Sequence, residues 1–404
     1  MVKANSLLYA VYVCLLIGLL LSGLLLLSNL YNQLNLFYTT HESLYVNNLS
    51  TINYALGNQL IEEPLTDENT GIQSSYFVKK HGLQTVLLTQ SSFQNDTVKS
   101  AHIIGQKLTN SEALYVANFT QPLNFSGTVK IKGTTFLPSE RVKEIYIENK
   151  PNLISLQGTK KIATIQLPKL SEDCYKIFEN KTAIKTTFKQ LEAKKDSVYF
   201  NSFFNEIIEI ELTTPFLDNK IIKGNFILSS NDSIVIRKST ILEDVIVRAP
   251  KVTIEAGFKG SLQVLAKERI FVGKEVNLNY PSTLCLFNES EEKKGTIFID
   301  EEVKISGLVL AFGNDLLHLE NNNIELSNNN LVIGTIYSSG TIMLKGSIFG
   351  SVYGAKMIHK TTAASYSNCI ADVEIDITQK PSIFVDLPIF NNQEQKYGII
   401  KKVL

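Results

Sequence analysis

Cysteine and histidine, the residues that most often bind metals or act as nucleophiles, are widely spaced in this chain. The four cysteines lack the C-x-x-C spacing of structural zinc sites, and no two histidines lie within ten residues of each other, so H-E-x-x-H pairs are absent. These residues are Cys14, Cys174, Cys285, Cys369, His41, His81, His102, His318 and His359. We predict no metal site and buried free thiols, with one Cys174–Cys369 disulfide as the open alternative.

Motifs for nucleophilic catalysis or phosphate binding are also absent. The sequence has no G-x-S-x-G elbow and no G-x-x-x-x-G-K-S/T loop. Gly346, Gly350 and Gly354 have the spacing of glycines in dinucleotide-binding loops, but β-type residues surround them, which favours turn glycines. We therefore predict no catalytic residue, no cofactor-binding residue and no cofactor, and expect that the protein is not an enzyme.

Two acidic clusters, at residues 289–292 and 300–302, are candidates for catalytic carboxylates because pectate-lyase-type enzymes carry acids on a solenoid face. Glu289, Glu291 and Glu292 run directly into Lys293 and Lys294. Mixed charge runs of this kind are typical of solvated loops. The G-G-x-G-x-D repeat of calcium-binding solenoids is absent as well.

The charges are balanced overall but unevenly distributed along the chain. The 404 residues carry 39 basic and 39 acidic side chains, and this balance argues against a nucleic-acid partner. Residues 1–60 contain only Lys3 and Glu42. A nearly uncharged N-terminal segment indicates a membrane location, with the lipid bilayer as a partner.

The segment from Leu7 to Leu27 is apolar apart from Ser22 and two glycines. As a helix its 21 residues would be about 31 Å long, which matches the hydrocarbon core of a bilayer. Lys3 on the short N-terminal side predicts a cytoplasmic N-terminus and a periplasmic or extracellular body. A cleaved signal peptide is disfavoured because the apolar run is too long and residues 26–29 form a poor cleavage site. A buried core helix is disfavoured because residues 4–41 carry no charge.

Apolar residues at helical spacing continue beyond this anchor until Pro64. We predict one helix over residues 6–61, on the order of 80 Å long. Its apolar stripe should pack on the protein's own body or on a partner helix, opposite a face rich in Asn, Ser and Thr. The stripe comprises Leu30, Leu34, Phe37, Leu44, Leu49, Ile52, Leu56 and Leu60, with His41 on the same face.

This layout of a basic start, an apolar anchor and a continuing amphipathic helix resembles the type IV pilins and pseudopilins over about 60 residues. The resemblance implies a β-rich head, leader cleavage after Ala4 and assembly through the helix. Mature position five would then be Tyr9, where most pilins carry Glu. A plain single-pass anchor with a helical stalk is the favoured alternative.

Residues 63–224 show short strand-like runs between turn residues, which predict a β-rich domain. The runs are 86–88, 128–131, 144–147 and 207–212, and residues 187–195 have helical spacing. Lys160, Lys161 and Lys169 suggest an exposed loop.

Residues 225–370 repeat a short unit of glycine, a small residue and β-branched residues. Glycines at 334, 340 and 346 are six residues apart, and asparagines at 321–323 and 328–330 bracket the run 324–326 as two corners. We predict a parallel β-helix, or solenoid, in preference to an antiparallel sandwich. The segment from 334 to 354 resembles the polymer-forming bactofilins, which implies the same fold, and residues 371–404 would form a cap or tail.

The predicted fold class is mainly β, with a transmembrane helix and stalk over residues 1–62. The favoured function is a membrane-anchored structural or interaction protein of a bacterial cell envelope, associating with a protein partner or itself through the stalk or the solenoid. A pilin-like subunit and an envelope-anchored carbohydrate-binding or carbohydrate-cleaving solenoid are the alternatives.

Overall fold

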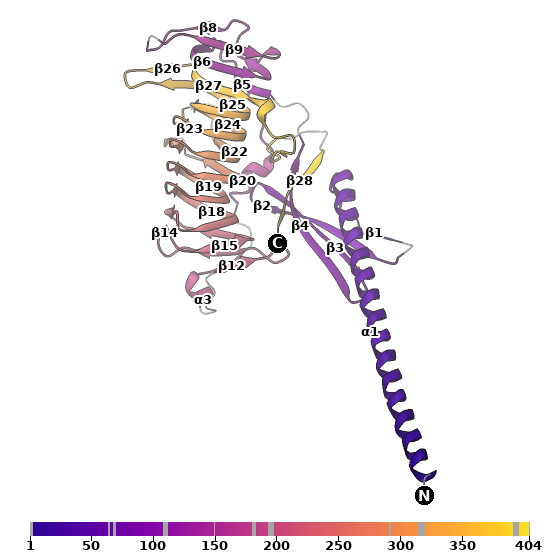
Figure 1. Ribbon diagram of the computed structural model, residues 1–404. Coiled ribbons are helices and arrows are strands. Elements are labelled where there is room, and N and C mark those ends of the chain that lie inside the picture. The colour runs from indigo at the N-terminus through magenta and orange to yellow at the C-terminus, as the bar shows by residue number, and fades with distance from the viewer. Residues whose placement is uncertain are drawn as a thin grey trace. The chain divides into compact units, whose positions relative to one another are not determined.

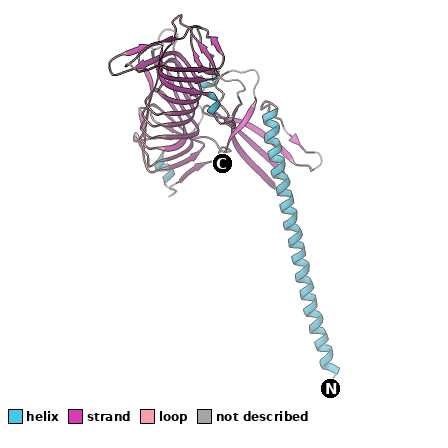
Figure 2. Ribbon diagram, turned by 45° about the horizontal axis from the view of Figure 1, so that its top comes forward, coloured by secondary structure: helices cyan, strands magenta, loops and turns pink. Residues whose placement is uncertain are grey.

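The computed structural model is mainly β, with one long helix near the N-terminus, as predicted (Figures 1 and 2). It describes residues 3–63, 65–67, 70–107, 112–148, 150–179, 183–192, 198–290, 292–313, 320–390 and 396–403. The chain divides into two compact units. The first comprises residues 1–77 and 89–100, and the second comprises residues 78–88 and 101–404.

Helix α1 (Lys3–Gly57) is uninterrupted over 55 residues. It ends four residues before the predicted boundary, because Gln59 and Leu60 adopt left-handed backbone angles (φ 51° and 63°) that no α-helix can continue through. Pro64, the predicted stop, lies outside the described residues. Ser22 donates its hydroxyl hydrogen to the Gly18 carbonyl at 2.8 Å, so this polar group is satisfied within the helix.

The part of α1 from Ser6 to Tyr38 is exposed on every described side chain. By length and composition this helix can cross a membrane, which agrees with the predicted anchor. Leu30, Leu34 and Phe37, from the predicted stripe, are each about half exposed. The first unit therefore leaves this part of the stripe uncovered.

Further along α1, the predicted stripe is buried only in part, since Leu49 is 42% exposed. Leu44 and Ile52 are buried as the stripe predicted, but Asn48 is also buried on this face. Its Oδ1 accepts hydrogen bonds from the Ser100 hydroxyl at 2.6 Å and the Thr89 hydroxyl at 3.1 Å. The expected separation into an apolar inner face and an Asn-rich outer face is therefore wrong here, because the neighbouring strands offer hydroxyl donors.

A five-stranded sheet has the order β1-β2-β3-β4-β28. Its strands are β1 (Leu65–Thr66), β2 (Gln73–His81), β3 (Gln84–Phe93), β4 (Asp96–Gln106) and β28 (Tyr397–Val403). Strands β2, β3 and β4 each pass from one unit into the other. The C-terminal strand β28 is antiparallel to β4 within the second unit.

The second unit contains a 23-stranded sheet. Its strands are β5 (Glu112–Val116), β6 (Asn124–Lys132), β7 (Thr134–Leu137), β8 (Lys143–Glu144), β9 (Leu153–Gln157), β10 (Lys160–Ile162), β11 (Ile184–Thr186), β12 (Val198–Asn201), β13 (Ile208–Glu211), β14 (Phe216–Leu217), β15 (Ile221–Gly224), β16 (Phe226–Ser229), β17 (Ser233–Ile236), β18 (Ile241–Ile254), β19 (Lys259–Val272), β20 (Asn277–Asn288), β21 (Gly295–Ile299), β22 (Lys304–Gly313), β23 (Asn322–Leu326), β24 (Leu331–Met343), β25 (Gly346–Lys360), β26 (Ser365–Ser367) and β27 (Cys369–Asp376). Among the described residues, three short helices accompany them: α2 (Glu172–Lys176), α3 (Phe188–Glu192) and the 3-10 helix η1 (Ile377–Gln379).

Pairing along this ladder is parallel, which contradicts the antiparallel sandwich; only the β25–β26 hairpin is antiparallel among its described pairs. The register aligns buried aliphatic side chains in three columns, each residue pairing with the next. One column is Val264, Leu284, Val309, Ile336 and Val352; the second is Val252, Ile270, Ile297, Ile324 and Ile342; the third is Leu278, Ile305, Val332, Ile348 and Ile375. No column member is more than 1% exposed, so these columns form the core of the unit.

Glycine and asparagine shape the corners between columns. Gly307, Gly334 and Gly350 pair with one another in successive strands. Gly334 has φ +133°, and a Cβ there would meet the Gly307 carbonyl oxygen at 2.0 Å, so only glycine fits. Asn330 Oδ1 accepts from the Val303 N–H at 2.8 Å, which supports the predicted corner after the strand at 324–326.

The six-residue glycine spacing has a different meaning from the one expected. The glycines that pair with one another are Gly307, Gly334 and Gly350, and the stretch of chain from one of them to the next is one repeat of the ladder. Gly340 and Gly346 both lie within the single repeat from Gly334 to Gly350. A six-residue step therefore covers only part of one repeat and not a complete repeat.

The ladder also extends beyond the expected range of 225–370. Strands of residues 184–224 precede it, and β27 pairs with β6, which pairs with β9. Residues 371–376 thus continue the ladder instead of capping it, because the backbone groups of β25 need a partner strand. The expected separation of 63–224 from 225–370 does not appear in the pairing.

Local predictions in the middle of the chain were confirmed in part. Residues 86–88, 128–131 and 207–212 fall largely in β3, β6 and β13, whereas the run 144–147 holds only the end of the two-residue strand β8. Helix α3 covers 188–192 of the expected 187–195, and residues 193–195 lie outside the described residues. Lys160 and Lys161 are exposed, but they lie in strand β10 and not in a loop.

Candidate functional site

Three cysteines predicted to be buried free thiols are so in the structure. Cys174, Cys285 and Cys369 are buried and unpaired, and the alternative disulfide between Cys174 and Cys369 is not formed. Burial raises the pKa of the Cys369 thiol to about 11. Burial also raises the pKa of the other two thiols, so all three remain protonated and unreactive at neutral pH. Cys14 is exposed on α1.

The histidines stay apart from one another in space as in sequence. His41 is exposed on α1 and stacks on Phe37 with ring centroids 5.9 Å apart. His81, His102 and His359 are buried in the second unit, and His318 lies outside the described residues. Within the part of the chain that the structure describes, no three His, Cys, Asp or Glu side chains are grouped to hold a metal ion.

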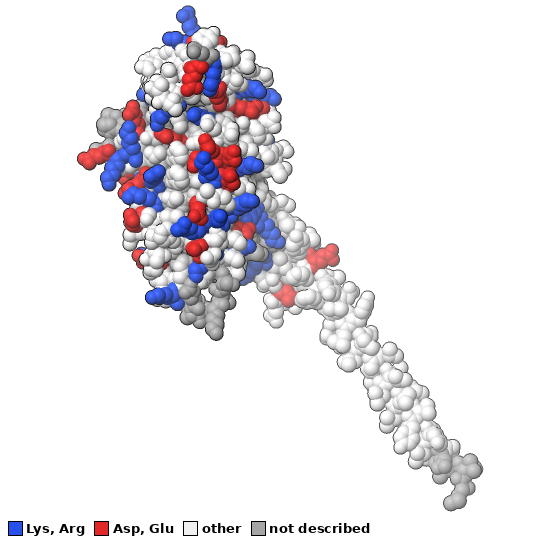
Figure 3. Space-filling model, turned by 60° about the vertical axis from the view of Figure 1, so that its left-hand side comes forward, with Lys and Arg blue, Asp and Glu red and all other residues white. Residues whose placement is uncertain are grey.

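The two acidic clusters lie on the surface in ion pairs with lysines. Glu301 Oε2 is 2.8 Å from Lys274 Nζ, and Glu289 Oε2 is 2.7 Å from Lys267 Nζ. Glu291 lies outside the described residues. Charged side chains of both signs are interspersed over the body, and the apolar helix segment has none (Figure 3). Exposed pairs of this kind contribute little to stability, because solvent screens them.

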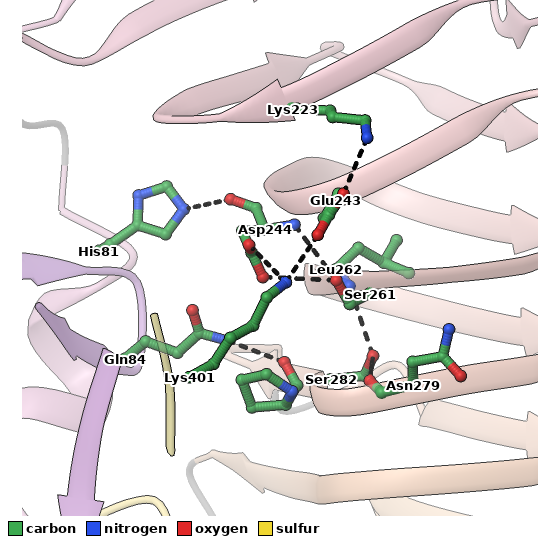
Figure 4. Close-up of polar contacts among 11 residues, drawn as sticks. His81, Gln84, Lys223, Glu243, Asp244, Ser261, Leu262, Asn279, Ser282 and Lys401 are labelled. Carbon is green, nitrogen blue, oxygen red and sulfur yellow. Dashed lines mark hydrogen bonds and ion pairs between the residues drawn. The ribbon is translucent and has the colours of Figure 1, made fainter. Parts of the chain in front are cut away.

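A partly buried polar cluster surrounds Asp244 in β18 (Figure 4). Lys401 of β28 lies with its Nζ 2.8 Å from Asp244 Oδ2 and 2.9 Å from Glu243 Oε1. Glu243 also pairs with Lys223 at 3.0 Å. Asp244 is 6% exposed, and its burial raises the pKa of the carboxyl group while the Lys401 ammonium opposes this rise.

The turn between β2 and β3 reaches the same cluster. His81 Nε2 donates to the Asp244 carbonyl oxygen at 2.9 Å, which leaves Nδ1 without a partner among the described residues. Gln263 clamps the turn, because its Nε2 donates to the His81 carbonyl at 2.7 Å and its Oε1 accepts from the Leu83 N–H at 2.9 Å. Burial lowers the pKa of His81 to about 4, so its ring is neutral at pH 7.

These contacts hold the β2–β3 turn and the C-terminal strand against one side of the parallel ladder. Each charged group of the cluster is paired within it, so the cluster fixes the position of these segments. The sequence did not indicate this cluster, since His81, Asp244, Gln263 and Lys401 come from distant segments without a shared motif.

No family model matches this chain, and no curated protein has a matching sequence. Among solved structures, the competence-associated pilin ComZ from Thermus thermophilus is similar at 11% identity, over 85% of this chain and 86% of that chain, with a TM-score of 0.25. A TM-score this low does not establish a shared fold.

Proposed function

We propose that this protein is a membrane-anchored structural or interaction protein of a bacterial cell envelope. The observation that carries the proposal is the run from Leu7 to Leu27 on α1, whose side chains are all exposed. Exposing a leucine to water costs roughly 1.5–3 kcal/mol relative to burial. Over this many leucines the sum amounts to tens of kcal/mol, which a bilayer would remove.

The parallel ladder of the second unit is, in this proposal, a β-solenoid. Its three buried columns and stacked glycine corners support this reading. A solenoid bonded along its whole length would give a stiff body for contacts with other envelope components. Lys3 before the anchor favours a cytoplasmic N-terminus, with the body on the opposite side of the membrane.

Membrane fractionation with N-terminal sequencing tests the anchor. The full chain should stay in the membrane pellet through alkaline carbonate washing, and a variant lacking residues 1–27 should be soluble and β-rich by circular dichroism. Deleting residues 1–62 is a harsher test, because it also removes Leu44 and Ile52 from the core of the first unit. A full chain released by carbonate would refute the anchor.

A pilin-like subunit is the second candidate, and the uncovered face of α1 beyond the anchor favours it. Leu30, Leu34 and Phe37 continue the face that Leu44 and Ile52 bury, so a helix of another copy could cover them. Leader cleavage after Ala4 would place Asn5 at the mature N-terminus, and an intact Met1 in purified protein would exclude such processing. Cysteine cross-linking at Leu34→Cys in membranes, with Gln33→Cys as the control, would test self-association.

A further inference from the structure

A cavity of about 550 Å³ lies where the corners of successive strands stack beside the β25–β26 hairpin. The corners contribute side chains from the turn before β24, the turn between β24 and β25, strand β27 and the loop after β8. The lining residues are Glu148, Lys150, Asn328, Asn329, Lys345, Gly346, His359, Lys360, Thr361, Thr362 and Asp372. All belong to the second unit. Apart from the His359 imidazole, the lining carries no aromatic ring and no large aliphatic side chain, so its occupant must be polar.

The two acids in the lining share one lysine. Lys150 Nζ is 3.0 Å from Asp372 Oδ2 and 3.5 Å from Glu148 Oε2. Asp372 Oδ1 also accepts from the Thr128 N–H at 3.0 Å. Lys150 balances one of the two carboxylates, and with Lys345 and Lys360 the charged side chains of the lining sum to +1, so the cavity as a whole does not repel an anion.

Lys345 and His359, in contrast, have no partner for their polar atoms among the described residues. No acid in the described part of the chain lies within ion-pair distance of Lys345, whereas Lys360 is held by Glu325 at 2.5 Å. His359 is 7% exposed, and its Nδ1 is buried without a hydrogen-bond partner in that part of the chain. Burial lowers the pKa of His359, and the Lys345 ammonium lowers it further. The unpaired Lys345 ammonium favours an anionic ligand, and the protonated nitrogen of the His359 ring is the donor that this histidine can offer to it.

We propose that this cavity binds an acidic saccharide, with Lys345 pairing to the sugar carboxylate and His359 hydrogen-bonding beside it. Asn328, Asn329 and Thr362 supply amide and hydroxyl groups for the sugar hydroxyls, and no hydrogen bond of these side chains occupies them within the described residues. The volume suits one or two sugar rings, since small-ligand sites span about 300–1,000 Å³. The inference goes beyond the anchoring role and does not depend on it, because every residue used lies in the second unit.

Isothermal titration of the full chain in detergent micelles with glucuronate, glucose and inorganic phosphate tests the proposal. We expect glucuronate to bind more tightly than either of the other two, because only glucuronate offers both a carboxylate and ring hydroxyls. Lys345→Gln should weaken glucuronate binding roughly tenfold, as expected for the loss of one charged hydrogen bond. His359→Gln should weaken it as well, and Lys259→Gln, an exposed lysine of β19 outside the cavity, should leave it unchanged.

Three results would overturn the proposal. The first is no heat with glucuronate at millimolar concentration. The second is phosphate or glucose binding as tightly as glucuronate, since that leaves no selectivity for an acidic sugar. The third is equal affinity of the Lys345→Gln and Lys259→Gln variants. Lys345 is only partly buried, so its substitution should preserve the fold, which an unchanged thermal midpoint would verify.

Discussion

Replacing His81 with glutamine should remove much of the protein's loss of stability in mild acid. In the folded chain, burial of His81 lowers its pKa to about 4, against an ordinary value of 6.5 in the unfolded chain. Between these two pH values the unfolded chain binds a proton that the folded chain does not. The free energy of unfolding therefore falls as the pH drops from about 6.5 to about 4, and this loss is complete below the folded pKa.

The size of the effect follows from the two pKa values. One pKa unit corresponds to about 1.4 kcal/mol, so the difference between 6.5 and about 4 corresponds to about 3 kcal/mol. His81 is 1% exposed, so solvent does not screen this energy. The amide introduced by His81→Gln could still donate to the Asp244 carbonyl, so the variant should keep the backbone contact while losing the proton-binding site.

Urea unfolding followed by tyrosine near-ultraviolet circular dichroism, on the full chain in micelles at pH 7 and pH 4, measures the effect. Wild type should lose about 3 kcal/mol more than His81→Gln over this interval, while the exposed His41→Gln variant should behave as wild type. Asp244 and Lys401 remain in all three proteins, so their titration cancels in the comparison. An equal loss of stability in wild type and His81→Gln would refute the desolvation argument.

Two further substitutions test the packing of the second unit by the same unfolding measurement. Gly334→Ala should destabilise the fold by more than about 3 kcal/mol, because its Cβ would overlap a backbone carbonyl. Gly257→Ala is the control: open space surrounds this glycine, so the substitution should cost about 1 kcal/mol. Equal effects of the two substitutions would contradict the close approach of strands at Gly334. Lys401→Met should lower the free energy of unfolding by about 3–5 kcal/mol, because it leaves the Asp244 carboxylate buried without its charged partner. Part of this loss should be recovered at low pH, where Asp244 is protonated. Lys402→Met, at an exposed lysine, is the control, and an equal effect of the two substitutions would contradict the buried pair.

Predictions that depended on local pattern were mostly confirmed. Hydropathy alone located α1, because about twenty consecutive apolar residues have few other uses. Short runs of β-branched residues located β6, β13, β23, β24 and β25 of the ladder, and the asparagine at 329 marked a corner because asparagine tolerates positive φ. Predictions were wrong where they required knowing which other segment packs against a given element. The buried side of α1 includes Asn48 because hydroxyls on two neighbouring strands complete its hydrogen bonds.

The candidate sites lay beyond the reach of sequence reasoning for the same reason. The cavity collects Glu148, Asn328, Lys345 and Asp372 at one corner, because strands distant in the chain pair in register there. No spacing rule links these positions, since the repeats of the ladder, measured from one paired glycine to the next, differ in length.

The sequence by itself determined that the protein has an apolar N-terminal segment, a long helix and a mainly β body, since hydropathy and periodicity act over a few neighbouring residues. Only the tertiary structure decided which strands pair, which polar groups become buried together and where an unpaired lysine meets a buried histidine. These features depend on contacts between residues far apart in the chain. Such contacts form only when the strands have paired and water is excluded from between them.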